Sequence, residues 1–316
     1  MKRILVTGAY GQIGTELIVA LRKKYGLENV IATDVKNTPP PEIADGPFDI
    51  VDVTKRDSIE KALKKYEIDS IFHLAAILSA TGEQKHLLAW DVNMNGTINI
   101  LEAARENSIR RVIIPSSIAA FGPETPKENT PQETVMRPRT MYGITKVAGE
   151  LLGEYYVRKF GLDVRGVRFP GIISWVTPPG GGTTDYAVAI YYAAVLDGYY
   201  ECFVREDTVL PMMYMPDAIK ALMDLAEVPF GRLTHHCDFN VTAISCRASD
   251  FEKAIKEYYP DFKVVYKPDR RQYIADSWPN SIDDSAARLE WQWCPEYDLK
   301  KMTEDMIMNL RKKFGK

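Results

Sequence analysis

The N-terminal stretch constrains the fold of this chain more than any other part of the sequence. Arg3–Thr7 is a short apolar run, a turn with Gly8, Gly11 and Gly14 follows it, and Thr15–Leu21 has the pattern of a helix. A buried strand, a glycine-rich turn and a helix in this order are typical of a site where backbone amides meet a pyrophosphate. An ordinary turn that happens to contain three glycines is the alternative, but it does not account for the strand and helix around it.

A carboxylate ends the second predicted strand. Val30–Thr33 is apolar and leads into Asp34, about 20 residues beyond the turn, where an acidic side chain commonly binds the adenosine ribose hydroxyls. A negative charge here would repel the additional phosphate of NADP, so Asp34 predicts NAD as the cofactor. Lys36 is close enough to keep NADP as an alternative.

Strand-like and helix-like segments alternate along the first half of the chain. The alternation predicts an α/β fold, a Rossmann-type doubly wound parallel sheet, with residues 1–170 as the NAD-binding domain. Beyond Pro170 the alternation fades, and residues 171–316 are expected to form mainly a smaller substrate-binding lobe, with some later segments returning to the first domain. The further predicted strands are Phe48–Val53, Ser70–Ala76, Arg111–Ser117 and Asp163–Phe169; helices are expected from the N-cap Thr54 to Tyr66, from Glu83 to Asn107, and from Tyr142 to Phe160.

Tyr142 and Lys146 lie one helical turn apart, on the same face of a predicted helix. A tyrosine has a reference pKa near 10 and is a poor base at neutral pH. A cation favours the phenolate, so Lys146 is expected to lower the pKa of Tyr142 and make it a base for an alcohol proton. This spacing is common in helices, and its meaning comes from the nucleotide-binding signals around it.

Charge and cysteine content exclude several classes of protein. The formal net charge of −3 and the pI near 5.9 provide no basic stripe for nucleic acid, so no such partner is expected. No apolar run has the length of a membrane span, and Met1–Arg3 leads into a strand and not a signal peptide. Four cysteines without paired spacing predict neither disulfides nor a metal site, and a reduced, cytoplasmic setting is expected. His235 and His236 lack supporting ligands.

The sequence resembles the extended short-chain dehydrogenase/reductase family from Lys2 to about Leu310. Thr7 to Gly14 matches the family's glycine pattern, His73 to Ala76 matches the strand under the cofactor, and Ser117 takes the catalytic place beside Tyr142 and Lys146. The resemblance also implies that Asp52 and Val53 lie by the adenine. The expected cofactor-binding set is Gly8, Gly11, Gln12, Ile13, Gly14, Asp34, Asp52, Val53, Leu74, Ala75, Ala76, Asn93, Tyr142, Lys146 and Pro170.

Three segments of the second half narrow the resemblance. Gly180–Ala187, Leu210–Ala218 and Ser277–Ser281 are similar to segments of short-chain-type L-threonine 3-dehydrogenases. This similarity implies oxidation of L-threonine by NAD to L-2-amino-3-oxobutanoate. Tyr142 would take the hydroxyl proton, while Ser117 would hydrogen-bond to the developing carbonyl and Lys146 would hold the nicotinamide ribose.

An amino acid substrate also needs partners for its two charged groups. Asp185 is the candidate for the ammonium, with Thr183 and Thr184 beside it, although a helix N-cap is an alternative role for it. Hydroxyls in the loop after the fourth strand, Ser79 and Thr81, are candidates for the carboxylate, with loop capping as their alternative. The expected substrate-binding set is Ser79, Thr81, Ser116, Ser117, Tyr142, Thr183, Thr184 and Asp185, in which Ser117 and not its neighbour Ser116 is expected to act in catalysis.

Other enzymes of the same fold and a non-enzymatic NAD-binding role are alternatives to this function. The same fold serves sugar-nucleotide epimerases, which need basic groups for a diphosphate, and dehydratases, which would carry an acid where Ile118 stands. A non-enzymatic NAD sensor would have little use for the serine, tyrosine and lysine together. The resemblance also implies a homodimer formed by two helices of each chain, with apolar stripes through Met94, Ile98 and Leu101 and through Ala148, Leu152 and Tyr155 at the interface.

Overall fold

The computed structural model describes all residues from 1 to 316, and a parallel six-stranded sheet forms its centre. The strand order β3-β2-β1-β4-β5-β7 reverses direction between β1 and β4, which makes a switch point at the carboxyl ends of these strands. The predicted Rossmann-type doubly wound sheet is therefore confirmed. Its strands are β1 Ile4–Thr7, β2 Val30–Asp34, β3 Phe48–Ile50, β4 Ser70–His73, β5 Arg111–Ile113 and β7 Val164–Arg165.

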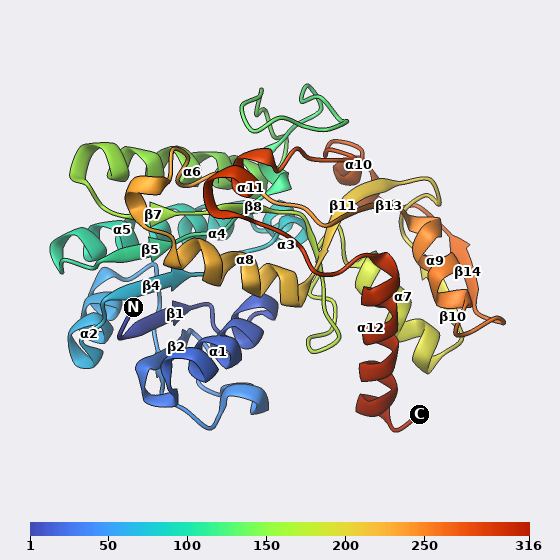
Figure 1. Ribbon diagram of the computed structural model, residues 1–316, viewed down its shortest axis with the longest axis horizontal. Coiled ribbons are helices and arrows are strands. Elements are labelled where there is room, and N and C mark those ends of the chain that lie inside the picture. Colours follow the sequence, from blue (N-terminus) through green and yellow to red (C-terminus); the bar gives the residue numbers. More distant parts are fainter.

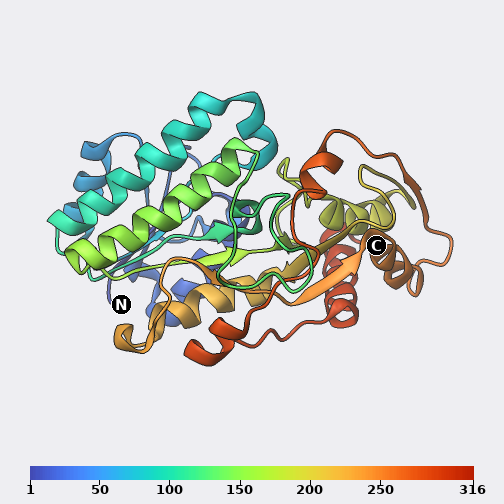
Figure 2. The ribbon, with the colours of Figure 1, turned by 90° about the horizontal axis from the view of Figure 1, so that it is seen from above.

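Helices cover both faces of this sheet because side chains alternate along each strand. Ile4 of β1 packs with α1 and α8 on one face, whereas Leu5 packs with α2, α5 and α6 on the other. Figure 2 shows the long helices α5 and α6 side by side on this second face. The helices are α1 Gln12–Tyr25, α2 Arg56–Tyr66, α5 Gly96–Glu106, α6 Met141–Phe160 and α8 Met215–Glu227, and the short 3-10 turns are η1 Leu27–Asn29, η2 Pro41–Ile43, η4 Ile118–Ala120 and η5 Phe230–Arg232.

Two predicted helices begin or continue differently in the structure. Thr54 is not an N-cap, because its hydroxyl donates to Asp52 at 2.7 Å and α2 begins only after Lys55. The helix expected from Glu83 to Asn107 is a series of four pieces that starts earlier. These pieces are α3 Ser79–Gln84, α4 His86–Trp90, the π-helical turn η3 Asp91–Asn95, and α5. A π-turn inside a helical run often marks a functional position.

Four predicted strands were too long. β3 ends at Ile50, whereas this strand was expected to reach Val53. β4 ends at His73, and Leu74 to Ala76 run on without strand pairing. The strand expected from Arg111 to Ser117 breaks at Pro115, which has no amide to donate. The strand expected from Asp163 to Phe169 breaks at Gly166, where a Cβ would lie 2.4 Å from the Ile114 carbonyl oxygen. The separated ends form a second small sheet, in which β8 Val167–Phe169 pairs with β6 Ser116–Ser117 on one side and with β12 Phe239–Asn240 on the other.

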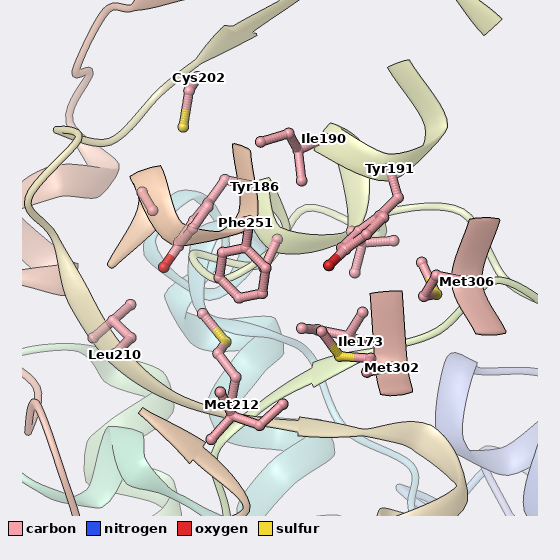
Figure 3. Packing of buried hydrophobic residues seen from close by; sticks show 14 of the residues in the cluster. Ile173, Tyr186, Ile190, Tyr191, Cys202, Leu210, Met212, Phe251, Met302 and Met306 are labelled. Atoms are coloured by element: carbon pink, nitrogen blue, oxygen red, sulfur yellow. The ribbon is translucent and has the colours of Figure 1, made fainter. Parts of the chain in front are cut away.

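The second half of the chain forms a lobe with a core of its own. Figure 3 shows Tyr186, Tyr191 and Phe251 packing with Met302 and Met306 around the strands of this lobe. Its elements are β9 Gly171–Ile173, α7 Tyr186–Leu196, β10 Tyr199–Cys202, β11 Val209–Tyr214, β13 Ile244–Arg247, α9 Ala248–Lys256, β14 Lys263–Tyr266, α10 Arg271–Ala275 and α12 Leu299–Phe314. By contrast α8 packs on the central sheet, and α11 Ser285–Trp291 packs on β12. The division at residue 170 stays a prediction.

Other global features concern membranes, cysteines and metal ligands. None of the helices combines the length and apolar character that a membrane span requires. All four cysteines are free, and no three histidine, cysteine or acidic side chains gather as a metal site. The two neighbouring histidines have separate partners, since His235 Nδ1 meets Glu290 and His236 Nδ1 lies 3.3 Å from Glu154.

Candidate active site

The glycine turn brings the backbone of β1 and α1 into close contact with the next strand. Gly8 has φ +66°, and a Cβ there would lie 2.6 Å from the amide nitrogen of Ala75. A Cβ on Gly14 would lie 2.5 Å from the Gly8 carbonyl oxygen, so both positions require glycine. Gly11 is the N-cap of α1 and no side chain caps this helix, which leaves its first amides for an anion. The turn therefore fits the pyrophosphate of a dinucleotide.

Asp34 lies against this turn at the carboxyl end of β2. Its carboxylate accepts hydrogen bonds of 3.2 Å from the backbone amides of Tyr10 and Lys36. Asp52 accepts from the Thr54 amide at 3.0 Å, and Val53 packs against Gly96 of α5. These contacts hold Asp34, Asp52 and Val53 at the carboxyl side of β2 and β3, where the resemblance implies the adenosine end of the cofactor.

A cavity of about 260 Å³ extends from the glycine turn toward the lobe. Eighteen of the predicted site residues line it: Gly8, Gly11, Gln12, Ile13, Gly14, Leu74, Ala75, Ala76, Ser79, Asn93, Ser116, Ser117, Tyr142, Lys146, Pro170, Thr183, Thr184 and Asp185. Asp34, Asp52, Val53 and Thr81 do not line it. The cavity therefore unites the predicted catalytic residues with most of the expected cofactor and substrate contacts, whose roles remain predictions.

The helix α6 positions Tyr142 and Lys146. Thr140 caps this helix by accepting a hydrogen bond of 3.1 Å from Gly143, so Tyr142 lies in the first turn and Lys146 one turn later. Lys146 Nζ donates to the Pro115 carbonyl at 2.7 Å and lies 5.4 Å from the centroid of the Tyr142 ring. Ser117, from β6, accepts a 3.2 Å hydrogen bond from the Ala119 amide.

The electrostatics of this pair differ from the expectation. Burial raises the pKa of Tyr142 to about 12, and a hydrogen bond with Ser117 lowers it by less. The prediction that Lys146 lowers this pKa is wrong for this arrangement, because the ammonium is bound to the Pro115 carbonyl and the phenol end is desolvated. Burial also lowers the pKa of Lys146 to about 8, with Glu150 acting in the opposite direction.

Glu150 is a buried carboxylate in the wall of the cavity that was not among the predicted site residues. It forms an ion pair with Arg168 at 2.8 Å and accepts the hydroxyl of Ser116. Burial raises the pKa of Glu150, while Arg168 opposes this shift. Ser116 and Ser117 thus have different partners, as their alternation along a strand predicts. The signal for Glu150 was present in the sequence, since it lies one helical turn after Lys146.

Asn93 and His73 organise the floor of the site. The Asn93 side chain accepts from the Ile77 amide at 2.8 Å and donates to Thr145 of α6 at 3.1 Å. It therefore connects the π-turn, the chain after β4 and the catalytic helix. His73 lies between the hydroxyls of Thr7 and Thr97, and burial lowers its pKa to about 3, so its ring is neutral.

The lobe supplies the remaining wall. Asp185 occupies the N-cap position of α7 without bonding to that helix, because its Oδ2 accepts from Gly181 at 2.7 Å and Gly182 at 2.8 Å. It therefore closes the glycine loop before it. Ser79 lies 3.4 Å from the Thr183 hydroxyl and belongs to α3, as Thr81 does, and not to a loop as predicted.

Sixteen of the 34 lining residues were not among the predicted contacts, and Trp278 is one of them. Trp278, with 5% of its surface exposed, lines the cavity beside this wall. Its position in the segment Ser277–Ser281 was the only sequence signal for it. Its indole gives the substrate end of the cavity a large apolar surface.

Comparison with known proteins places this site in a family. The family model described as "NAD dependent epimerase/dehydratase family" matches residues 4–232. The chain is 52% identical over 311 residues to an uncharacterized epimerase/dehydratase of Staphylococcus saprophyticus, covering 97% of this chain and 96% of the relative. It superposes on the L-threonine dehydrogenase of Clostridium difficile with a TM-score of 0.97 and 53% identity, covering 99% and 98% of the two chains. A monomeric L-threonine 3-dehydrogenase from a metagenome gives a TM-score of 0.95 and 49% identity, with 98% and 99% coverage. The chain belongs to the NAD-dependent epimerase/dehydratase family, within the extended short-chain dehydrogenases/reductases, and its cofactor is NAD.

Proposed function

We propose that the protein oxidises the side-chain hydroxyl of L-threonine with NAD, giving L-2-amino-3-oxobutanoate. The observation that carries this proposal is that Asp185 lines the same cavity as Ser117 and Tyr142. A carboxylate, a base and a hydroxyl donor around one small cavity suit a substrate that carries both an ammonium and a secondary alcohol. The similarity to solved L-threonine dehydrogenases supports the same reaction.

The residues have distinct tasks in this reaction. The Ser117 hydroxyl donates a hydrogen bond to the substrate oxygen, which becomes a carbonyl, and Tyr142 as phenolate takes the hydroxyl proton. Bound NAD would supply the acceptor for the hydride that leaves the carbon bearing this oxygen. Lys146, whose ammonium donates to the Pro115 carbonyl in this structure, would hold the nicotinamide ribose when NAD is bound. Asn93 holds the floor under these groups through Ile77 and Thr145.

Asp185 is the proposed partner of the substrate ammonium. Burial raises the pKa of this carboxyl above its ordinary value, against the hydrogen bonds from the glycine loop. A cation beside a buried carboxylate replaces part of its lost hydration, so an ammonium is favoured there over a neutral group. The hydroxyls of Ser79 and Thr184 line the cavity nearby and are candidates for the substrate carboxylate.

A sugar-nucleotide epimerase is the second candidate within this family, and the charge of the cavity argues against it. Lys146 is the only lysine or arginine among the lining residues, so the diphosphate of a nucleotide sugar would have few cationic partners. The test is to mix the protein with NAD and a panel of 3-hydroxy amino acids and nucleotide sugars, following NADH absorbance and sugar conversion. L-threonine-dependent NADH supports the proposal, and sugar conversion without it would replace the proposal by the epimerase.

We also propose a homodimer through the outer face of α4, α5 and α6. Leu87, Ile98, Leu151 and Tyr155 are 76%, 40%, 64% and 52% exposed on these helices. Met94 and Leu101, two of the residues expected in this stripe, are instead buried within the chain, with 7% and 0% of their surface exposed. Light scattering after size exclusion distinguishes the two states: a mass near twice 35.8 kDa supports the dimer, and a single-chain mass refutes it.

A further inference from the structure

The segment Ser174–Val176 lies between the nucleotide-binding half and the lobe. It follows β9 directly and begins the loop that carries Thr183, Thr184 and Asp185 into the cavity. In Figure 1 this yellow-green loop lies between α1 and α12. Its middle, Pro178 to Gly181, is exposed and has no regular structure. The position of the loop therefore depends on how its two ends are fixed.

One contact fixes the first end to the cofactor-binding helix. The hydroxyl of Ser174, which is fully buried, donates to the carboxyl group of Glu16. The same oxygen accepts a 3.0 Å hydrogen bond from the Val176 amide. Glu16 belongs to α1, two residues after Gly14 of the glycine turn. One hydroxyl thus joins the helix that meets the pyrophosphate to the start of the substrate loop.

Contacts from the lobe fix the other side of this segment. Lys313 of α12 donates to the Val176 carbonyl at 2.6 Å and to the Trp175 carbonyl at 3.2 Å. Tyr192 of α7 donates to the same Trp175 carbonyl at 2.7 Å. The neighbouring Lys312 is exposed and has no such contact, so it provides a matched control on the same helix.

We propose that Glu16 and Lys313 are positioning residues for substrate binding, which hold Ser174–Val176 so that Thr183, Thr184 and Asp185 stay in the cavity. The inference rests on the proposed function. It assigns the two residues no contact with substrate or cofactor, because neither lines the cavity. Their effect passes through the loop, whose far end is fixed by Asp185 and by the contact between Ser79 and Thr183.

Titratable groups from both the nucleotide-binding half and the lobe act on the carboxyl group of Glu16. Burial raises the pKa of Glu16 to about 7, while Ser174 and Lys313 of α12 lower it. Glu42 of η2 opposes ionisation, and the phenols of Tyr192 and Tyr214 also face the carboxyl group from α7 and β11. The pKa of Glu16 is therefore higher where the two halves bury its carboxyl group than it is in contact with water.

The test compares Ser174→Ala and Lys313→Ala with the control Lys312→Ala in the full-length enzyme. Loss of either contact should raise the KM for L-threonine by roughly 5-fold or more, while kcat and NAD affinity stay within about 2-fold. Lys313→Arg should keep the KM of the unmodified enzyme, because arginine also donates hydrogen bonds to carbonyl groups. Hydrogen–deuterium exchange in residues 174–187 should be faster in both alanine variants and unchanged in the control.

Two results would overturn the inference. One is an unchanged KM together with unchanged exchange in the loop. The other is a parallel loss of NAD affinity, kcat and thermal stability, which would mean that these contacts only hold the fold together. If the unmodified enzyme does not oxidise L-threonine, the proposed function fails, and the exchange measurement, which needs no substrate, still decides whether the contacts hold the loop.

Discussion

The ammonium of Lys146 donates a hydrogen bond of 2.7 Å to the carbonyl of Pro115, and its Nζ lies 5.4 Å from the centre of the Tyr142 ring. The two side chains are thus neighbours whose strongest interactions are with other groups. Burial shifts both toward the neutral form, with the pKa of Tyr142 at about 12 and that of Lys146 at about 8. In the proposed mechanism the phenolate therefore forms from a phenol whose pKa is raised, so the rate should depend on pH.

Tyr142→Phe removes the proton acceptor and keeps the ring that packs in the cavity wall. Turnover of L-threonine should fall by about 10²-fold or more, because general base catalysis is lost, while NAD still binds. Initial rates and NAD titration by fluorescence measure the two effects. Tyr273→Phe, at an exposed position of α10, is the control, and near-normal turnover in Tyr142→Phe would end the proposed mechanism.

The rate of oxidation should depend on pH through the same group. Because burial raises the pKa of Tyr142 to about 12, the phenolate fraction increases as pH rises, and kcat should increase through the neutral and mildly alkaline range. Steady-state rates in overlapping buffers measure this profile. A rate that is flat or falls as pH rises would show that a group other than this phenol controls proton transfer.

Asp34→Ser should change the preference between cofactors. The carboxylate is expected to accept hydrogen bonds from the ribose hydroxyls and to repel a ribose phosphate, so its loss should weaken NAD and improve NADP. The ratio of kcat/KM values for the two cofactors measures the change, with Asp261→Ser, an exposed position in the lobe, as control. Equal use of both cofactors by the unmodified enzyme would contradict this role for Asp34.

Asp185→Asn tests the ammonium partner. The amide oxygen can still accept hydrogen bonds from Gly181 and Gly182, but the charge that favours a cation is gone. The KM for L-threonine should therefore rise by roughly 10-fold or more, with NAD affinity unchanged. A loss of thermal stability with normal kinetics would instead assign Asp185 to the structure of the loop alone.

Glu16→Gln should make thermal stability less dependent on pH. The pKa of Glu16 rises from 4.5 to about 7 on burial, so the unfolded chain loses this proton first and stability falls as pH rises between these values. Glutamine cannot ionise, and the melting temperature of the variant relative to wild type should increase by roughly 1–3 °C from pH 5 to pH 8. Scanning calorimetry measures the difference, with the exposed Glu28→Gln as control. A constant difference across this range would place the carboxyl group outside the buried contact.

The sequence alone determined the sheet, the cofactor and the main cavity residues, because these depend on local patterns. A glycine turn between a strand and a helix has a steric reason at Gly8 and Gly14, and one helical turn puts Tyr142 and Lys146 on the same face. The tertiary structure decided features that depend on contacts between distant segments. It split strands at Pro115 and Gly166 and turned Leu101 inward.

The tertiary structure also decided the electrostatics of the site. Spacing predicts that Lys146 is near Tyr142, but only the folded chain brings the Pro115 carbonyl to its ammonium and removes water from the phenol. It likewise joins Glu16 to Ser174, which are 158 residues apart, and brings Trp278 to the cavity. Periodicity gives the face on which a side chain lies, whereas its pKa and its partners follow from burial and from segments that meet only in the folded chain.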